Sequence, residues 1–333
     1  MRQELTRGQL WGIVLAAGEG TRVRDFLRQL CGGRGIKQFC TIVGRRSLLE
    51  HTLARVERLI PRERIVVVVS TDHQTEAAQQ LAHWPADNVI FQPANRDTAP
   101  GVLLPLAHVI HRDLSATVAI FPSDHFILDE ELFMAYVQGA VDEMRRFPHE
   151  LTLLGMTPDR AEEGYGWIEP GAEEMGRATR AVWRFWEKPS APQTHALLRR
   201  KALWNTFVCV AHAATIWQMV AQVAPDLTQA FRILQHALGN SEAEEVLEHI
   251  YATLRPVNFS VAVCEPLSSR LRVLPVPDVG WSDWGNVERI CATLQQLGKL
   301  DDVIQRVCVA HRGSRIGESS QTLPKELQLS NVI

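Results

Sequence analysis

The chain has 333 residues, is 46% hydrophobic and carries a formal net charge of −3 at pH 7. This length and apolar content allow a large core, in one α/β domain or in a domain with a smaller lobe. A charge near zero argues against nucleic acid as a partner, and no apolar run reaches the roughly 20 residues that span a bilayer.

The cysteines and the N-terminal segment bear on the cellular compartment. Six cysteines are scattered along the chain without a C-x-x-C pair. That pattern is typical of reduced thiols rather than of a disulfide framework or a zinc site. Residues 1–8 are polar and contain no apolar signal-peptide core. We therefore expect a cytoplasmic protein that does not contact a membrane.

The segment 11–37 combines an apolar run, a glycine turn and a cluster of cations. A buried strand is expected over 11–16, followed by a turn that contains Gly18 and Gly20. The following residues 22–46 contain seven arginine and lysine residues and only one acidic residue. Because glycine lets the backbone approach a ligand, this pattern predicts a cradle for a polyphosphate. The alternative is an ordinary strand-turn-helix with a solvated basic face.

Two familiar phosphate motifs are absent from this stretch. The sequence has no G-x-x-x-x-G-K-[ST], so it contains no Walker A loop. Gly18 and Gly20 begin a G-x-G, but Val23 stands where the dinucleotide fingerprint needs its third glycine.

The first half of the chain alternates between strand and helix patterns. Ser47 and Glu50 have the spacing of a capping box, and Thr98 followed by Pro100 predicts a helix start with Thr98 as N-cap. Strands and helices are expected, in chain order, at 47–59 (helix), 64–69 (strand), 74–83 (helix), 88–91 (strand), 101–111 (helix), 117–121 (strand) and 130–146 (helix). Repeated βα units predict an α/β fold with a doubly wound, mixed but mostly parallel sheet.

The second half has a different pattern. A glycine- and aromatic-rich turn is expected over 164–171. Strands are expected at 151–155, 181–186, 203–210, 257–265 and 271–276. Helices are expected at 191–201, 214–223, 226–238, 241–253 and from 285 to about 297. One domain over 1–297 is the expectation, followed by a polar, partly disordered tail over 298–333.

Two carboxylates stand where chemistry is expected. Asp124 directly follows an apolar strand, and ligands of open α/β sheets bind beyond the carboxyl ends of strands. Asp283 lies between Trp281 and Trp284, where a carboxylate is costly to bury unless it is paired or metal-bound. Beside a phosphate cradle, the two suggest Mg²⁺ held by carboxylates and substrate phosphates. The alternative is that each aspartate only caps a turn.

Other polar motifs carry weaker signals. Glu187 and Lys188 end a strand, which also fits a solvated strand end. Asn205 precedes a strand, where asparagine often forms a turn, and the pair Tyr165-Gly166 fits a simple turn as well as a sugar contact. No H-x-x-x-H pair and no G-x-S-x-G elbow is present.

Taken in order, these segments resemble the sugar-1-phosphate nucleotidylyltransferases, and within them the mannose-1-phosphate guanylyltransferase branch. The resemblance covers about 11–285. Five segments carry it: the signature turn 15–22, the triplet 37–39, the loop 95–100, the segment 122–125 and the segment 280–283. It implies a Rossmann-like fold with a nucleotide-binding half over 11–147 and a sugar-phosphate-binding half over 148–297, without the isomerase domain of long bacterial members.

The resemblance also implies roles for individual residues. The implied catalytic residues are Arg22, Lys37, Asp124 and Asp283, of which Asp124 and Asp283 hold Mg²⁺. The implied nucleotide-binding residues are Ala16, Ala17, Gly18, Gly20, Thr21, Arg22, Lys37, Asn95, Thr98 and Ala99. The implied sugar-phosphate-binding residues are Tyr165, Gly166, Glu187, Lys188 and Asn205. Partners would be GTP or another nucleoside triphosphate and a sugar 1-phosphate, with a homo-oligomer left open.

Several positions depart from the family pattern. Ile36 replaces the usual proline before Lys37, and Val23-Arg24 replaces a usual Leu-Trp-Pro. Asp97 stands where the family has asparagine in the loop near the base, and Thr206-Phe207 replaces a usual Ser-Gly. These departures leave open a glucose-1-phosphate transferase that uses UTP or dTTP, and a non-catalytic regulator that binds a nucleotide-sugar.

Overall fold

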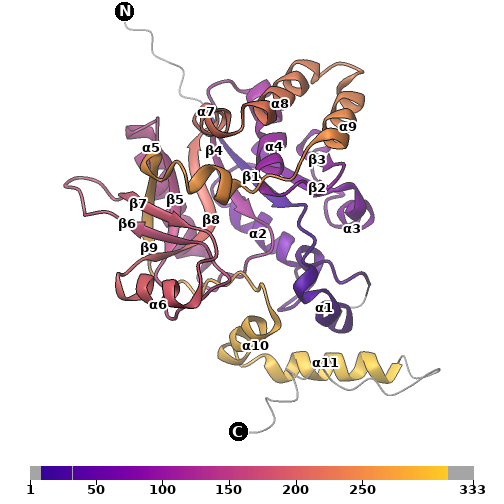
Figure 1. Cartoon of the computed structure of the whole chain (residues 1–333). Helices are drawn as coiled ribbons and strands as arrows, with labels where there is room; N and C mark the ends of the chain where they lie inside the picture. Colours follow the sequence, from indigo (N-terminus) through magenta and orange to yellow (C-terminus); the bar gives the residue numbers. More distant parts are fainter. Residues whose placement is uncertain (1–8, 32, 314–333) are drawn as a thin grey trace, which may run out of the picture.

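The first half of the chain forms the parallel part of a nine-stranded sheet (Figure 1). The structure is a computed structural model that describes residues 9–31 and 33–313, with side chains described up to residue 306. Four strands lie in the order β3-β2-β1-β4, and all are parallel. Their bounds are β1 Leu10–Ala16, β2 Ile65–Ser70, β3 Val89–Gln92 and β4 Thr117–Pro122. The four strands expected from the sequence are confirmed.

The second half continues the same sheet mainly with antiparallel pairs. Its strands are β5 Leu151–Met156, β6 Trp167–Pro170, β7 Arg180–Trp186, β8 Leu203–His212 and β9 Leu271–Val276. β8 runs antiparallel to both β4 and β5, and β7 runs antiparallel to both β6 and β9. Because β6 also pairs with β8, the pairings close a circuit through β8, β5, β9, β7 and β6. The sheet is mixed as expected, but the prediction that it is mostly parallel is wrong, because five of its nine strand pairings are antiparallel.

Helices cover both faces of the parallel strands. The helices are α1 Arg24–Cys31, α2 Leu48–Val56, α3 Gln74–Gln80, α4 Thr98–Arg112, α5 Glu130–Arg146, α6 Ala191–Arg199, α7 Ala213–Val223, α8 Pro225–Ala237, α9 Ala243–Thr253, α10 Val287–Gln296 and α11 Leu300–Gly313. Ser47 and Glu50 form the predicted capping box of α2, with Glu50 N to Ser47 Oγ at 3.1 Å. The N-cap of α4 is Asp97 rather than Thr98, because the Asp97 side chain accepts from Thr98 N.

Two segments of the second half differ from the sequence-based expectation. Within the expected strand 257–265, residues Ser260–Cys264 form a π-helix, and the residues before it bond the loop at 96–99. The β-branched composition of 257–265 therefore gave a wrong strand prediction, because this segment pairs with a loop and not with another strand. The expected turn 164–171 contains β6, which pairs with β7 and β8. The expected tail contains α11, and residues 314–333 lie outside the described residues.

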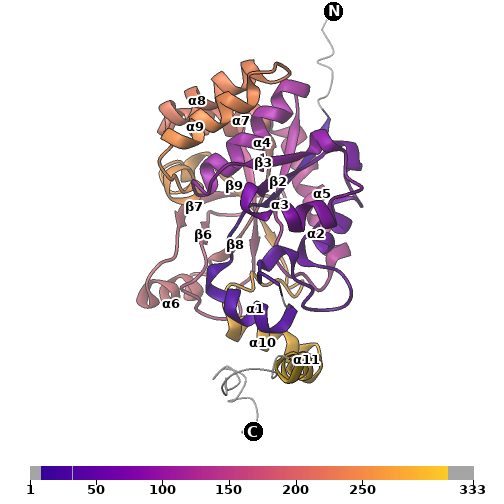
Figure 2. The ribbon, with the colours of Figure 1, turned by 90° about the vertical axis from the view of Figure 1, so that its right-hand side faces the viewer.

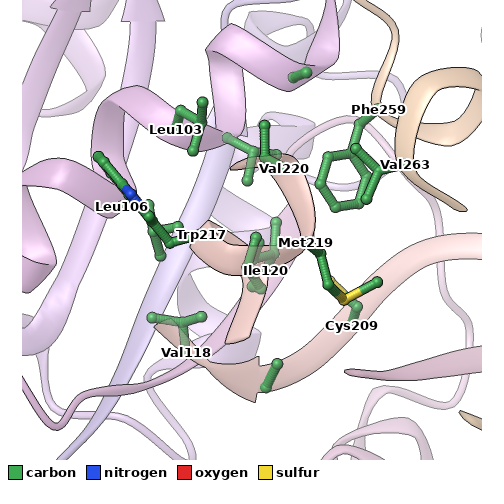
Figure 3. Close-up of a cluster of buried hydrophobic side chains, with 14 of the residues drawn as sticks. Leu103, Leu106, Val118, Ile120, Cys209, Trp217, Met219, Val220, Phe259 and Val263 are labelled. Atoms are coloured by element: carbon green, nitrogen blue, oxygen red, sulfur yellow. The ribbon is translucent and has the colours of Figure 1, made fainter. Parts of the chain in front are cut away.

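The central parallel strands β1, β2 and β4 are buried on both faces, and alternate residues of these strands contribute to two different cores. In β1, Ile13 faces the core of α4, α7 and α8, whereas Val14 faces the core of α2 and α5. Such double burial explains the continuous apolar runs of the parallel strands. Figure 3 shows the core on the side of α4, α7 and α8. It lies between α4, β4, β8, α7 and the π-helix, with Ile120 near its middle.

A third, smaller core joins the C-terminal helices to the segment after β1. Both views place α1, α10 and α11 together at one end of the molecule (Figures 1 and 2). The buried members of this third core are Val23, Phe26, Leu27, Leu30, Cys40, Ile42, Leu48, Trp284, Ile290, Leu294 and Val303. Arg306 of α11 donates to Ile42 O. The basic segment is therefore fixed by helices more than 250 residues away in sequence, as the Arg306–Ile42 bond alone spans 264 residues.

Candidate active site

The glycine turn after β1 is shaped to admit Lys37. Gly20 adopts a left-handed conformation with φ 58°, and a Cβ on it would lie 2.9 Å from Lys37 Cβ. Both the positive φ and the close approach require glycine here. Gln38 fixes the turn from the other side, because its Nε2 donates to Ala16 O at 2.7 Å and to Gly18 O at 2.9 Å. The turn and the triplet 37–39 are therefore one packed unit.

Lys37 connects the two aspartates that the sequence singled out. Its Nζ donates to Asp124 Oδ2 at 2.8 Å and also to the backbone carbonyl oxygen of Asp283. The Lys37 side chain is only 4% exposed, while that of Asp124 is 33% exposed. A buried ammonium needs such partners. The structure thus brings together three of the four predicted catalytic residues, from segments 246 residues apart.

The charges around Lys37 lower the pKa of both carboxyl groups. Burial alone would raise the pKa of Asp124, but the Lys37 ammonium outweighs burial and brings this pKa below its usual value. Burial would likewise raise the pKa of Asp283, and Arg289 together with Lys37 lowers it instead. Both groups are therefore anionic at neutral pH, as ligands of a divalent cation must be.

Arg289 is a site residue that the sequence analysis missed. It lies in α10, is 6% exposed, and donates from Nη1 to Asp283 Oδ1 and from Nη2 to Glu162 Oε1 at 3.2 Å. Its guanidinium also lies 4.4 Å from the ring centroid of Tyr165. An arginine in a helix pattern gives no local signal of this role. Only the fold places it beside Asp283.

The fourth predicted catalytic residue, Arg22, is exposed and approaches the same carboxylate. A Cβ on Gly285 would lie 2.6 Å from Asp283 Oδ2 and 3.0 Å from Arg22 Nη2. Glycine at 285 therefore allows this carboxylate oxygen and the Arg22 guanidinium to lie close to the same backbone position.

The donor set fits magnesium that is shared with substrate phosphates. Asp283 Oδ1 accepts hydrogen bonds from Arg289 and from Gly285 N, whereas Oδ2 accepts none among the described residues. Asp124 Oδ2 is bonded to Lys37, while Oδ1 lies 3.8 Å from His125 Nε2. Among the described residues, no cluster of three or more His, Cys, Asp or Glu side chains could hold a metal. Two carboxylates plus phosphate oxygens is a usual arrangement for Mg²⁺.

A cavity of about 480 Å³ lies beside the glycine turn, at the carboxyl ends of β1 and β3. Its lining includes Ala17, Gly18, Gln92, Asn95, Asp97 and Thr98. The Gln92 side chain is buried, and its Oε1 has no hydrogen-bond partner among the described residues. An unpartnered buried acceptor costs about 1–3 kcal/mol, so Gln92 marks a place where a ligand N–H is expected. No sequence pattern singled out Gln92 for this role.

The loop that walls this cavity carries backbone strain. Asp97 has φ 67° and ψ −171°, a conformation that is essentially restricted to glycine. The second half of the chain holds it there, because Asn258 Nδ2 donates to Asp97 Oδ1 at 3.1 Å and Phe259 N donates to Thr98 Oγ1 at 2.8 Å. Ala99, which was predicted to bind the nucleotide, is fully buried, and its N–H is bonded to Val257 O.

The predicted sugar-phosphate residues gather in part. A Cβ on Gly166 would lie 3.1 Å from Glu187 Oε2 and 3.2 Å from Asn205 Cβ, so glycine permits this close approach. Lys188 is 56% exposed and pairs with Glu187 at 3.2 Å. Tyr165 is 4% exposed, and burial beside Asp283 raises its pKa to about 12. Tyr165 is therefore a neutral, packed residue against Trp204 and Trp281.

The profile of the nucleotidyl transferase family matches residues 11–299, and the chain therefore belongs to this family. A mannose-1-phosphate guanylyltransferase of Salmonella muenchen is 28% identical over 285 residues, which cover 82% of this chain and 57% of that protein. One from Escherichia coli (strain K12) is 28% identical over 291 residues, 85% of this chain and 59% of that protein. The chain thus spans less than two thirds of the length of these curated relatives.

A solved structure agrees with this fold. A protein of Thermus thermophilus, described as a mannose-1-phosphate geranyltransferase, matches with a TM-score of 0.75 and 27% identity, over 86% of this chain and 79% of that one. In the part of the chain that the structure describes, no helix has the length and apolarity to cross a membrane.

Proposed function

We propose that this chain transfers a nucleotidyl group from a nucleoside triphosphate to a sugar 1-phosphate, releasing pyrophosphate and a nucleotide-sugar. GTP and mannose 1-phosphate are the favoured substrates. The observation that carries the proposal is the buried Lys37, whose Nζ holds Asp124 and Asp283 together beside the glycine turn. The names of the relatives support the same reaction class.

The reaction needs little from the protein beyond positioning and charge. The nucleophile is a phosphate oxygen of the sugar phosphate, which is already ionised at neutral pH, so no general base is required. The obstacle is repulsion between two anions. Lys37 and Arg22 would hold the triphosphate and neutralise the departing pyrophosphate. Asp124 and Asp283 would hold Mg²⁺, which supplies further charge neutralisation at the reacting phosphate.

The polar groups of the 480 Å³ cavity favour guanine. Gln92 offers an unpartnered acceptor, and Asp97 adds a carboxylate at the same wall. Guanine presents two neighbouring donors, N1–H and N2–H₂, which match two acceptors. Uracil and thymine present a single N–H between two carbonyl oxygens, which leaves one of these acceptors facing another acceptor.

Asn205, Glu187 and Lys188 would bind the sugar phosphate. Glu187 and Asn205 adjoin Gly166, where the absence of a side chain allows close approach. The half-exposed Lys188 would move from Glu187 to an incoming phosphate, which carries more negative charge than a carboxylate.

A substrate matrix tests the proposal. Purified protein and MgCl₂ would be incubated with each pair drawn from GTP, UTP, dTTP and ATP and from mannose and glucose 1-phosphates, and pyrophosphate would be measured. We expect the highest rate with GTP and mannose 1-phosphate. A preference for UTP or dTTP with glucose 1-phosphate would replace the proposed substrates. Absence of pyrophosphate from every pair would favour a nucleotide-sugar-binding regulator.

A further inference from the structure

The segment 257–268, which contains the π-helix, contacts both candidate substrate sites. Its first residues bond the loop 96–99, which carries Asp97 and Thr98 of the 480 Å³ cavity. Its last residues bond the end of β7, which Glu187 and Lys188 follow in the chain. We call 257–268 the bridging segment. The proposed reaction assigns it no role.

At one end, the bridging segment fixes the loop that walls the cavity. Asn258 Nδ2 donates to Asp97 Oδ1, and Asn258 Oδ1 accepts from Val261 N at 3.0 Å, at the start of the π-helix. The backbone of Val257 also bonds the loop with both its N–H and its carbonyl group. Asn258 therefore uses its amide twice, once for the cavity loop and once for the helix. Asp97 needs such support because its φ is positive.

At the other end, two side chains of the bridging segment hold the end of β7. Glu265 Oε1 accepts from Glu187 N at 2.7 Å, and Ser268 Oγ accepts from Phe185 N at 3.1 Å. The Ser268 hydroxyl in turn lies 2.8 Å from Glu265 O, its own acceptor. Lys188, the proposed ligand of the sugar phosphate, comes next in the chain and has φ 47°. Its position therefore depends on Glu265 and Ser268.

Between its two ends, the bridging segment is one packed unit. Glu265 N donates to Ser260 O at 2.9 Å, which is the hydrogen-bond pattern of a π-helix. Phe259 is 3% exposed and belongs to the core shown in Figure 3, and its ring packs edge-on against that of Phe207 in β8. Single π-helical turns are rare and occur frequently at functional sites. Because a close-packed interior transmits strain, a displacement at one end reaches the other.

We propose that the bridging segment couples the two substrate sites, with Asn258 and Glu265 as positioning residues. A nucleotide in the cavity confines the loop of Asp97 and, through it, the bridging segment. The segment then holds Lys188 in place for the sugar phosphate, which binds more tightly because part of the ordering has already occurred. By linkage, the sugar phosphate strengthens nucleotide binding by the same factor. This coupling rests on the proposed function, since it concerns the same two substrates.

Isothermal titration calorimetry with mannose 1-phosphate tests the coupling. The chain is titrated in MgCl₂, alone and with a saturating concentration of the α,β-methylene analogue of GTP, which cannot release pyrophosphate. We define the coupling factor as the ratio of the two Kd values, and we expect about 10 or more for the wild type. If the substrate matrix selects another pair, the corresponding analogue and sugar phosphate replace these two ligands.

The two substrates also meet at the reacting phosphate, so the variants must show that the coupling runs through the bridging segment. Glu265→Ala removes the acceptor for Glu187 N and should lower the coupling factor about 3- to 10-fold, the value of one hydrogen bond. The Kd of the analogue alone should stay close to that of the wild type. A wild-type coupling factor in Glu265→Ala would overturn the proposal.

Two further variants define the contact. Glu265→Gln keeps an oxygen that can accept from Glu187 N, so it should keep the wild-type coupling factor. Loss of the factor in this variant would assign the effect to the charge and contradict the positioning role. Glu50→Ala is the matched control, because Glu50 also accepts a backbone N–H, that of Ser47, at 2.7 Å. It should leave the factor unchanged, and a loss equal to that of Glu265→Ala would overturn the proposal. Thermal unfolding of each variant checks the fold.

Asn258→Asp tests the opposite end of the bridging segment. Its carboxylate can still accept from Val261 N, but it cannot donate to Asp97 and repels it. The coupling factor for mannose 1-phosphate should therefore fall here too. The double variant Asn258→Asp/Glu265→Ala should lose no more than the larger single loss, because both changes interrupt one element. Additive losses would indicate two independent supports and contradict a single coupled segment.

Hydrogen exchange of the wild type gives a readout that needs neither a variant nor the second substrate. The methylene analogue alone should slow exchange of the amides of Phe185 and Glu187, which the bridging segment accepts. Protection confined to the glycine turn and the cavity loop would overturn the coupling. A chain that releases pyrophosphate but shows equal Kd values with and without the analogue would refute only the coupling. A chain that releases no pyrophosphate from any substrate pair would refute the proposed function.

Discussion

The two halves of the sheet position their polar groups by different means. In the parallel half, the glycine turn, Gln92 and Asp124 lie at or just after the carboxyl ends of β1, β3 and β4. In the antiparallel half, Asn205 lies within β8, and several non-glycine residues have positive φ, among them Lys188 at 47°, Phe207 at 61° and Trp284 at 45°. Most candidate groups of the first half thus lie at regular strand ends, whereas the second half contains several residues with a strained backbone.

A strained backbone needs contacts from elsewhere in the fold. Phe207 packs its ring 6.1 Å from that of Phe259, and Trp284 stacks on Phe126. Asp97 is the exception in the first half, and Asn258 of the second half holds it. The comparison therefore predicts that changes in the second half will alter geometry and activity together, while changes in the first half will act mainly through charge.

The largest effect is expected for Asp283→Asn. The change removes the negative charge that interacts with Arg289 and Lys37. It also removes one proposed magnesium ligand, so pyrophosphate release should fall by at least ~10³-fold. Asp124→Asn, the matched change in the first half, should lose activity with less loss of thermal stability, because Asp124 is more exposed. Near-normal turnover of Asp283→Asn would break the assignment of the two carboxylates.

Lys37→Ala should lower turnover on the order of 10²- to 10³-fold, by loss of one electrostatic contact to the phosphates. The loss should be similar for every nucleoside triphosphate, measured as kcat/KM for each. If only one base were affected, Lys37 would be reading the base and not the phosphates.

Lys188→Ala should raise the KM for the sugar 1-phosphate about 10-fold and leave the KM for the nucleotide unchanged, because one charge-assisted contact of roughly 1.5 kcal/mol is lost. Lys201→Ala is a suitable control, since Lys201 is also an exposed lysine with positive φ, 58°. Equal effects of the two changes would remove Lys188 from the sugar-phosphate site.

Gln92→Leu should reduce the preference for GTP over UTP by about 3- to 10-fold, since it deletes one acceptor for a neutral donor. The ratio of kcat/KM values for the two nucleotides measures this effect. An unchanged ratio with a lower rate for both would show that Gln92 shapes the cavity without reading the base.

The smallest effect concerns acid stability. The folded-state pKa values of Asp124 and Asp283 lie below the ordinary 3.8, so both groups bind protons more weakly in the folded chain. The stability that they contribute is complete above about pH 5 and is lost as the pH falls through and below 3.8. Urea unfolding between about pH 6 and about pH 3 should show a steeper loss for the wild type than for Lys37→Gln, in which Asp124 lacks its ammonium partner. Parallel curves would contradict this coupling.

Local patterns predicted the parts of the fold that depend on local physics. The β-branched runs of β1 and β2, the capping box of α2 and the helices of the first half are confirmed, because each follows from neighbouring residues. The position of Asp124 after β4 is also a property of the chain order. The prediction of a strand over 257–265 was wrong. The residues before the π-helix bond the loop at 96–99, about 160 residues earlier in the chain.

By itself, the sequence determined an α/β domain with a basic glycine turn and two distant aspartates, because strand periodicity, glycine turns and charge clusters are properties of neighbouring residues. Only the tertiary structure decided that Lys37 joins Asp124 to Asp283, that Arg289 holds Asp283, and that Gln92 faces a cavity without a partner among the described residues. These relations depend on which buried groups meet across the sheet. Burial makes a charge or an acceptor costly unless it is paired, and which partner it finds is a property of the folded chain.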